Sequence, residues 1–163
     1  TSLTYEDQVI SISNKRKKTV LSKIETGNNE ITFKTILEYE NGLYDYYEKE
    51  FRGFETVRIK KIDNELSNEN DTYFKVIENK YRIFDNDGTY TDGFKNYDQY
   101  IKGLLSSTIN KFVHIDVNNN NWIEYILSEK IYDYRTHDLF PETYTDIKSI
   151  ENYQITEKIY GRS

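Results

Sequence analysis

Apolar and polar residues alternate with a period of two along most of this chain. Between residues 31 and 39, Phe33 and Leu37 fall on one side of an extended segment, and Lys34 falls on the other. The same alternation recurs over residues 57–60. Successive side chains of a strand point to opposite faces, so this pattern is typical of antiparallel sheets with one face in water. The pattern predicts an all-β chain built from hairpins.

Short polar stretches rich in Asn, Asp and Gly divide the alternating runs. Asn-Gly favours tight hairpins because both residues tolerate positive φ, and we interpret Asn41-Gly42 as such a turn. The expected strands cover residues 7–13, 18–25, 30–40, 43–50, 54–62, 72–78, 80–85, 111–117, 122–134 and 151–160. The helical spacing of apolar residues in 97–105 adds a candidate short helix. Residues 63–71 and 136–145 are interpreted as polar loops.

The length of 163 residues suits a single domain. We therefore treat 1–163 as one β-rich region. Its first part, residues 1–62, is expected to hold hairpins that end in a corner at Glu50-Phe51-Arg52-Gly53-Phe54. The second part, residues 63–163, is expected to hold further strands and loops.

Composition supports the sheet prediction. The chain has no Ala and no Met, which favour helices, but it has 16 Tyr and 8 Phe, which suit strands. The absence of Cys excludes disulfides and thiolate metal sites. Because the chain lacks Met and begins at Thr1, we expect a processed product or an excised piece of a longer protein.

Charge argues against two classes of partner. The formal net charge is −6, and the one basic run, residues 14–18, is interpreted as a solvated turn between strands. We therefore expect no nucleic-acid partner. No apolar run approaches the roughly 18 residues needed to span a bilayer, so we expect no direct membrane insertion.

Candidate metal sites do not survive inspection of their spacing. The stretch 85–93 is rich in Asp, Asn and Gly, but aligning Gly88 with the sixth position of an EF-hand loop places Ile83 first and Phe94 twelfth. Neither residue can bind calcium, so an ordinary turn is the better interpretation. His114 is expected on a sheet surface and His137 in a polar loop, which leaves no zinc site. We predict no metal and no cofactor.

Candidate catalytic groups have ordinary structural explanations. The carboxylate pairs Glu38/Glu40, Glu48/Glu50 and Asp133/Asp138 are interpreted as solvated charge, since acid–base catalysis needs two carboxylates in unequal environments. The Tyr-rich stretches 44–47 and 132–134 are candidate platforms for a sugar or peptide. Tyr also packs across strands with its hydroxyl at the wet edge, and we favour that structural interpretation.

One stretch carries a family resemblance. Residues 42–57, which include Glu50-Phe51-Arg52-Gly53-Phe54, resemble the "G-x-Y-D … E-R-E-F-R-G-F-G-x-V" signature of the B components of bacterial toxin complexes and the related SpvB-like toxins. Four further pieces follow the family's order, at residues 21–28, 102–108, 128–134 and 151–162. Glu55 stands where the family usually has Gly, and no "W-F-H-T-G" counterpart is evident between residues 62 and 101.

The resemblance implies a structural role in a secreted bacterial toxin. In that family this region belongs to a shell-like β-sheet that encloses a toxic effector, so the five residues of the Glu50–Phe54 motif are carried over as structural, with no catalytic residue. The implied partners are adjoining modules or the C component of the complex, and the translocation channel is a further candidate.

Two other function classes were weighed. An ADP-ribosyltransferase, which SpvB-like proteins carry, expects Ser-Thr-Ser followed by Glu-x-Glu; here Ser106-Ser107-Thr108 has another order and the Glu-x-Glu pairs precede it. We therefore predict that the chain is not an enzyme. The alternative that stays open is an independent Tyr-rich β-module that binds glycan or peptide.

Overall fold

The computed structural model describes residues 1–11, 16–27, 32–45, 49–62, 71–83, 103–116, 121–140 and 144–160, with the side chains at 11, 45, 50, 71, 121, 135–140 and 144–153 left aside. These residues form eight strands and no helix. The strands are β1 (Ser2–Ser11), β2 (Arg16–Gly27), β3 (Thr32–Asp45), β4 (Glu50–Ile62), β5 (Asp71–Tyr81), β6 (Leu105–Asp116), β7 (Asn121–Phe140) and β8 (Tyr144–Ile159).

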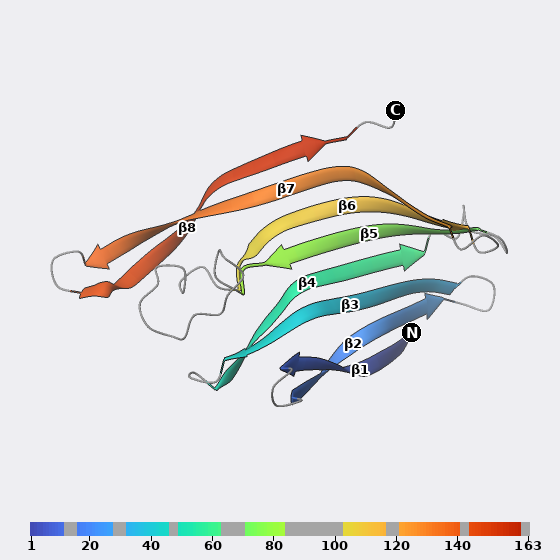
Figure 1. Ribbon diagram of the computed structural model, residues 1–163, viewed down its shortest axis with the longest axis horizontal. Coiled ribbons are helices and arrows are strands. Elements are labelled where there is room, and N and C mark those ends of the chain that lie inside the picture. The colour runs from blue at the N-terminus through green and yellow to red at the C-terminus, as the bar shows by residue number, and fades with distance from the viewer. Residues whose placement is uncertain are drawn as a thin grey trace.

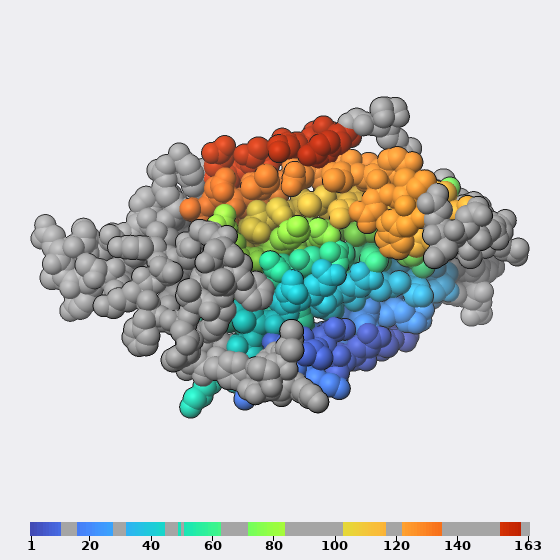
Figure 2. Space-filling model, in the orientation of Figure 1, coloured from blue at the N-terminus to red at the C-terminus, as the bar shows by residue number. Residues whose placement is uncertain are grey.

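The strands form one antiparallel sheet in which spatial order follows chain order from β1 to β8 (Figure 1). Each strand therefore pairs with its neighbours in sequence, and the colours in Figure 2 run across the sheet from blue to red. The sheet is open, with β1 and β8 as its edges. The predicted all-β, antiparallel fold is confirmed.

The Asn41-Gly42 turn predicted from sequence is wrong. β3 continues through this pair, and its register with β4 runs from Glu40 opposite Thr56 to Gly42 opposite Phe54. Asn41 does adopt a positive φ of 54°, but the backbone bends there without reversing. The predicted strands 30–40 and 43–50 are therefore largely one strand.

Other predicted boundaries also shift. The expected strand 72–78 and the start of the expected strand 80–85 merge into β5, which ends at Tyr81. The loop predicted over 136–145 is wrong at residues 136–140 and 144–145, because β7 runs to Phe140 and β8 begins at Tyr144. His137 thus lies in β7, opposite Ser149, and not in a loop. Of the candidate helix 97–105, residues 97–102 lie outside the described residues, and the last three form a turn and the start of β6.

The β1–β2 hairpin leaves the main sheet and crosses the far ends of β3 and β4. β2 pairs with β3 only over Lys23–Gly27, while its first half stays with β1. There Arg16 lies 4.1 Å from the ring centroid of Tyr44, and Lys18 lies 5.9 Å from that of Phe51. Arg16 to Lys18 therefore belong to a strand and not, as the sequence suggested, to a turn. Ile10 on β1 is buried where the hairpin meets Gly42.

Gly42 permits this close approach. A Cβ at Gly42 would lie 2.8 Å from Ile10 Cγ2, 2.9 Å from Phe54 Cε1 and 3.1 Å from Ile10 Cα. Gly42→Ala is therefore expected to destabilise the chain by about 1–3 kcal/mol, as overpacking does. Urea unfolding would measure this, and adding Ile10→Ala should cost less than the two single losses together. Strict additivity of the two losses would contradict the contact.

Apart from the β1–β2 hairpin, which packs over the ends of β3 and β4, the described strands form a single layer, and little of that layer is buried. Among the described side chains, six hydrophobic residues are buried: Ile10, Phe54, Val76, Ile83, Phe112 and Val113. Large apolar side chains stay exposed on both edge strands: Leu3, Tyr5 and Val9 on β1, and Ile155 and Ile159 on β8. Sheets normally bury one face against another layer.

Candidate functional site

The Phe-Arg-Gly-Phe segment forms a β-bulge inside β4. Leu43 faces Gly53 and Tyr44 faces Phe51, so Arg52 is the extra residue on β4. Gly53 has φ of 117°, a conformation that side chains rarely adopt. The sequence predicted a corner joining two strands, and this is corrected: the reversal precedes Glu50, and the motif bends a strand that continues to Ile62.

Phe54 places its ring at the centre of a small aromatic cluster. Its ring centroid lies 4.9 Å from that of Tyr39 and 5.1 Å from that of Phe51, which meets it edge-on. Phe54 is 8% exposed, whereas Phe51 is only half-buried. The Tyr39 hydroxyl donates to the Leu21 carbonyl at 2.8 Å and so ties the cluster to β2. The side chain of Glu50 lies outside the described ones.

A network of ion pairs crosses one face of the sheet from β3 to β7; we call it the charged network. Its members are Glu38, Glu40, Arg58, Lys60, Glu78, Lys111 and Glu124. Arg58 donates from Nε to Glu78 at 2.6 Å and from Nη1 to Glu40. Lys60 reaches Glu38 at 2.6 Å, and Lys111 lies 3.2 Å from Glu78 and 3.5 Å from Glu124. Each ion pair joins two neighbouring strands, so together the pairs cross-link the five strands from β3 to β7.

Glu78 is the centre of the network and is 4% exposed. Burial is the strongest influence on its pKa and by itself raises it, but hydrogen bonds from Arg58 and Lys111 outweigh burial and lower the pKa of Glu78 below 4.5. The pKa of Arg58 is raised, chiefly by its hydrogen bond to Glu40. Both groups therefore remain charged near neutral pH, which suits a structural bridge better than proton transfer.

The lowered pKa has a consequence for acid stability. A carboxylate whose pKa is lower in the folded chain contributes stability above its unfolded pKa, and that stability is lost as pH falls through the folded pKa. The stability difference between the natural chain and Glu78→Gln should therefore shrink progressively as pH falls below about 4.5. Urea unfolding of both chains between pH 7 and pH 3 would measure it. A difference independent of pH would contradict the assigned ion pairs.

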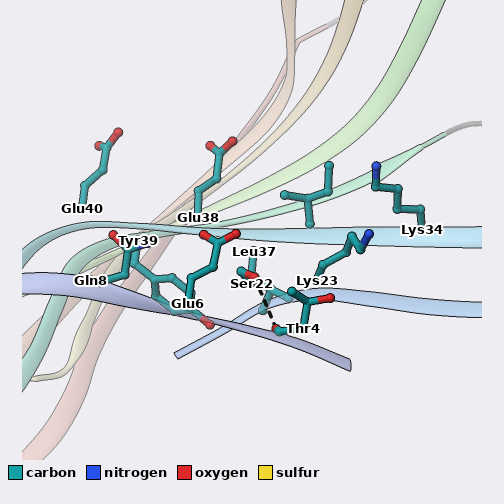
Figure 3. A pocket seen from close by; sticks show the side chains of 11 residues that line it. Thr4, Glu6, Gln8, Ser22, Lys23, Lys34, Leu37, Glu38, Tyr39 and Glu40 are labelled. Atoms are coloured by element: carbon teal, nitrogen blue, oxygen red, sulfur yellow. Dashed lines mark hydrogen bonds between the residues drawn. The ribbon is translucent and has the colours of Figure 1, made fainter. Parts of the chain in front are cut away.

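Beside the charged network, a groove of about 460 Å³ lies between β1, β2 and β3 (Figure 3). Glu6, Glu38 and Glu40 gather toward one end of it, and Lys23 and Lys34 toward the other. Two of these acids are already paired, with Lys60 and Arg58, and Lys23 lies 3.1 Å from Glu25. The groove thus contains opposite charges that are largely matched within the sheet.

The structure assigns ordinary roles to most groups considered from sequence. Glu38 and Glu40 lie on the same face of β3 and form ion pairs with Lys60 and Arg58, as expected of surface carboxylates. His114 stacks on Tyr73 across the β5–β6 pair, with ring centroids 4.5 Å apart. Asp133 lies 3.7 Å from Arg82. Residue 48 and the calcium candidate 85–93 lie outside the described residues. At residues 50 and 138 the backbone is described but the side chain is not.

Hydroxyl groups are also used for structure. Ser106 donates to the Lys80 carbonyl at 3.0 Å, and Thr108 donates to Asn79 at 2.9 Å. The Tyr134 hydroxyl donates to the Leu105 carbonyl at 2.7 Å, which supports the packing interpretation of the Tyr-rich stretch 132–134. In the part of the chain that the structure describes, no group of three or more His, Cys, Asp or Glu could hold a metal ion. Nor does that part contain a helix long and apolar enough to cross a membrane.

Sequence reasoning missed the centre of this arrangement. Glu78, Arg58 and Lys111 drew no attention because their partners lie about 20 to 33 positions away in sequence. A signal was nevertheless present: Glu78 and Lys111 are charged residues inside alternating runs, at positions that share a face with apolar neighbours. Such charges need a partner when they are buried.

Comparison with known proteins gave one match. The family model described as the insecticide toxin TcdB middle/N-terminal region matches residues 8–84, which include the end of β1, all of β2 to β5, the bulge and five of the seven members of the charged network. No curated protein and no solved structure matched the chain significantly. This match bears out the resemblance to the middle region of toxin-complex B components over residues 8–84, which are just under half of the chain.

Proposed function

We propose that this chain is a non-catalytic wall segment of a secreted bacterial toxin and that it helps to enclose or dock a toxic effector. The proposal rests on the family match together with one structural observation: the described strands form an open sheet that is a single layer beyond the β1–β2 hairpin, and its edge strands carry exposed apolar side chains. A sheet of this kind lacks the second layer that ordinarily buries one face.

The edges supply the surfaces by which a wall would be continued. The outer edge of β8 has no partner strand among the described residues. The side chains of Ile155 and Ile159 on this strand are 55% and 80% exposed. On β1, Leu3, Tyr5 and Val9 are each at least half exposed. Exposed strand edges and apolar clusters favour pairing with another polypeptide. We expect that polypeptide to be an adjoining module of the same toxin or its C component.

The charged network would keep such a wall in shape. Its ion pairs link β3 to β7 on one face, and its members neutralise one another. At the centre of the network, hydrogen bonds from Arg58 and Lys111 lower the pKa of Glu78, which suits an ion pair better than proton transfer. The proposal therefore assigns the enzymatic activity of the toxin to another module.

Substituting the exposed β8 side chains tests the proposal. Ile155→Lys with Ile159→Lys should change the stability of the isolated chain by less than about 1 kcal/mol, since both side chains are exposed. In the complete toxin the same change should prevent assembly and expose the effector to protease. Gln154→Lys, also on exposed β8, is the control and should leave protection intact. Full protection with both Ile residues replaced would count against a wall continued through β8.

A further inference from the structure

We propose that the groove beside Trp122 binds a neutral saccharide. The groove has a volume of about 360 Å³ and spans the sheet from β3 to β7. This volume falls within the range of small-molecule sites. The inference does not depend on the wall role, because the surface of a wall segment can carry such a site.

Trp122 lies at the rim of this groove. Its side chain is on β7, yet its ring centroid lies 5.5 Å from Nζ of Lys60 on β4, so the two side chains meet above β5 and β6. The indole N–H donates to Glu124 Oε1 at 3.2 Å, which fixes the ring's orientation. The residue is nevertheless 49% exposed. Lys60 Nζ lies over the ring, and the indole surface that stays exposed is the part on which the C–H groups of a sugar ring can stack.

The charges lining the groove balance. Three acids (Glu38, Glu78 and Glu124) face three bases (Arg58, Lys60 and Lys111), so an ionic ligand gains no net attraction. The ion pairs within the set hold these groups in fixed positions. Fixed carboxylates and cations form a row of acceptors and donors, and a polyhydroxyl ligand can use both without losing a charge of its own.

The floor of the groove is apolar. Val76 and Val113 line it and are 4% and 1% exposed. A sugar ring has an apolar face and a rim of hydroxyl groups. The combination of apolar floor, stacking ring and paired polar walls therefore matches a neutral saccharide better than it matches a phosphate, a nucleotide or a charged peptide.

Trp122 is the only Trp in the chain, so its fluorescence reports directly on this groove. Titration of the 163-residue chain with neutral trisaccharides of glucose, galactose, mannose and N-acetylglucosamine should change the emission of Trp122 saturably for at least one sugar. A charged peptide of alternating Lys and Glu serves as the competing ligand. The proposal would be overturned if only the peptide bound saturably. It would also be overturned if no sugar changed the emission at a concentration of about 10 mM, ten times a dissociation constant of about 1 mM.

Substitutions separate stacking from general loss of structure. Trp122→Ala should weaken saccharide binding at least tenfold in ligand-observed NMR, whereas Trp122→Phe should retain part of it. Tyr125→Ala is the matched control, since Tyr125 is also 49% exposed on β7 but lies on the opposite face, paired with Phe112. Equal weakening by Tyr125→Ala would overturn the site. Unchanged melting temperatures would show that each variant is folded.

Discussion

Phe54→Ala is expected to lower the free energy of unfolding by about 3–5 kcal/mol, the usual cost of removing a buried phenylalanine. Phe54 is 8% exposed and contacts both Tyr39 and Phe51 through its ring. Its loss removes the side chain around which the β1–β2 hairpin, β3 and β4 meet. Because the sheet buries so few apolar residues, neighbouring side chains have little means to fill the cavity.

Two phenylalanines serve as controls for this prediction. Phe33→Ala on β3 should cost less than about 1 kcal/mol, because Phe33 is 59% exposed. Phe51→Ala should fall between the two, as Phe51 is half-buried. Thermal or urea unfolding of all three variants would give the order. If Phe54→Ala proved no more costly than Phe33→Ala, the bulge would not anchor the hairpin.

Glu78→Gln is expected to destabilise the chain by about 3 kcal/mol. Removing one member of a buried ion pair leaves its partners uncompensated, at a typical cost of about 3–5 kcal/mol. The lower end applies here because Arg58 and Lys111 remain 25% and 15% exposed at their side chains and keep some access to water. The amide keeps the size of the carboxyl group, so the loss reports on charge and not on packing.

Glu124→Gln is the matched control for Glu78→Gln. Both carboxylates contact Lys111, but the Glu124 side chain is 43% exposed. An exposed ion pair contributes about 0–1 kcal/mol, so Glu124→Gln should have little effect on stability. Comparable losses from the two substitutions, measured by urea unfolding at pH 7, would contradict the central place given to Glu78.

The fold class was accessible from sequence because it depends on local pattern. Alternation such as that of Phe33, Lys34 and Leu37 reports directly on a strand with two unlike faces, and all-β antiparallel architecture follows from it. Hairpin order also follows, since neighbouring strands separated by short polar stretches pair with each other.

Strand boundaries were harder to predict from sequence because residues typical of turns also occur inside strands. Asn41-Gly42 carries the signature of a turn, but here Asn41 bends a continuous strand and Gly42 makes room for Ile10. The role of Gly42 depends on Ile10 in the β1–β2 hairpin, which lies about thirty residues earlier in the sequence. Local turn chemistry cannot distinguish these cases.

The charged network was inaccessible for a related reason. Glu78 bonds Arg58 and Lys111 across three strands, and pairing of that kind depends on register, which single-residue patterns do not specify. The motif at Glu50–Phe54 was recognisable through its family resemblance, but its geometry, a bulge with Gly53 at positive φ, became evident only with the register of β3 and β4.

A structure of the complete toxin by electron cryomicroscopy would test the proposed wall most directly. The account predicts that strands from outside residues 1–163 pair with the outer edges of β1 and β8, that Ile155 and Ile159 become buried, and that one face of the sheet borders an enclosed chamber. A sheet whose two edges and both faces all lie in solvent would contradict it.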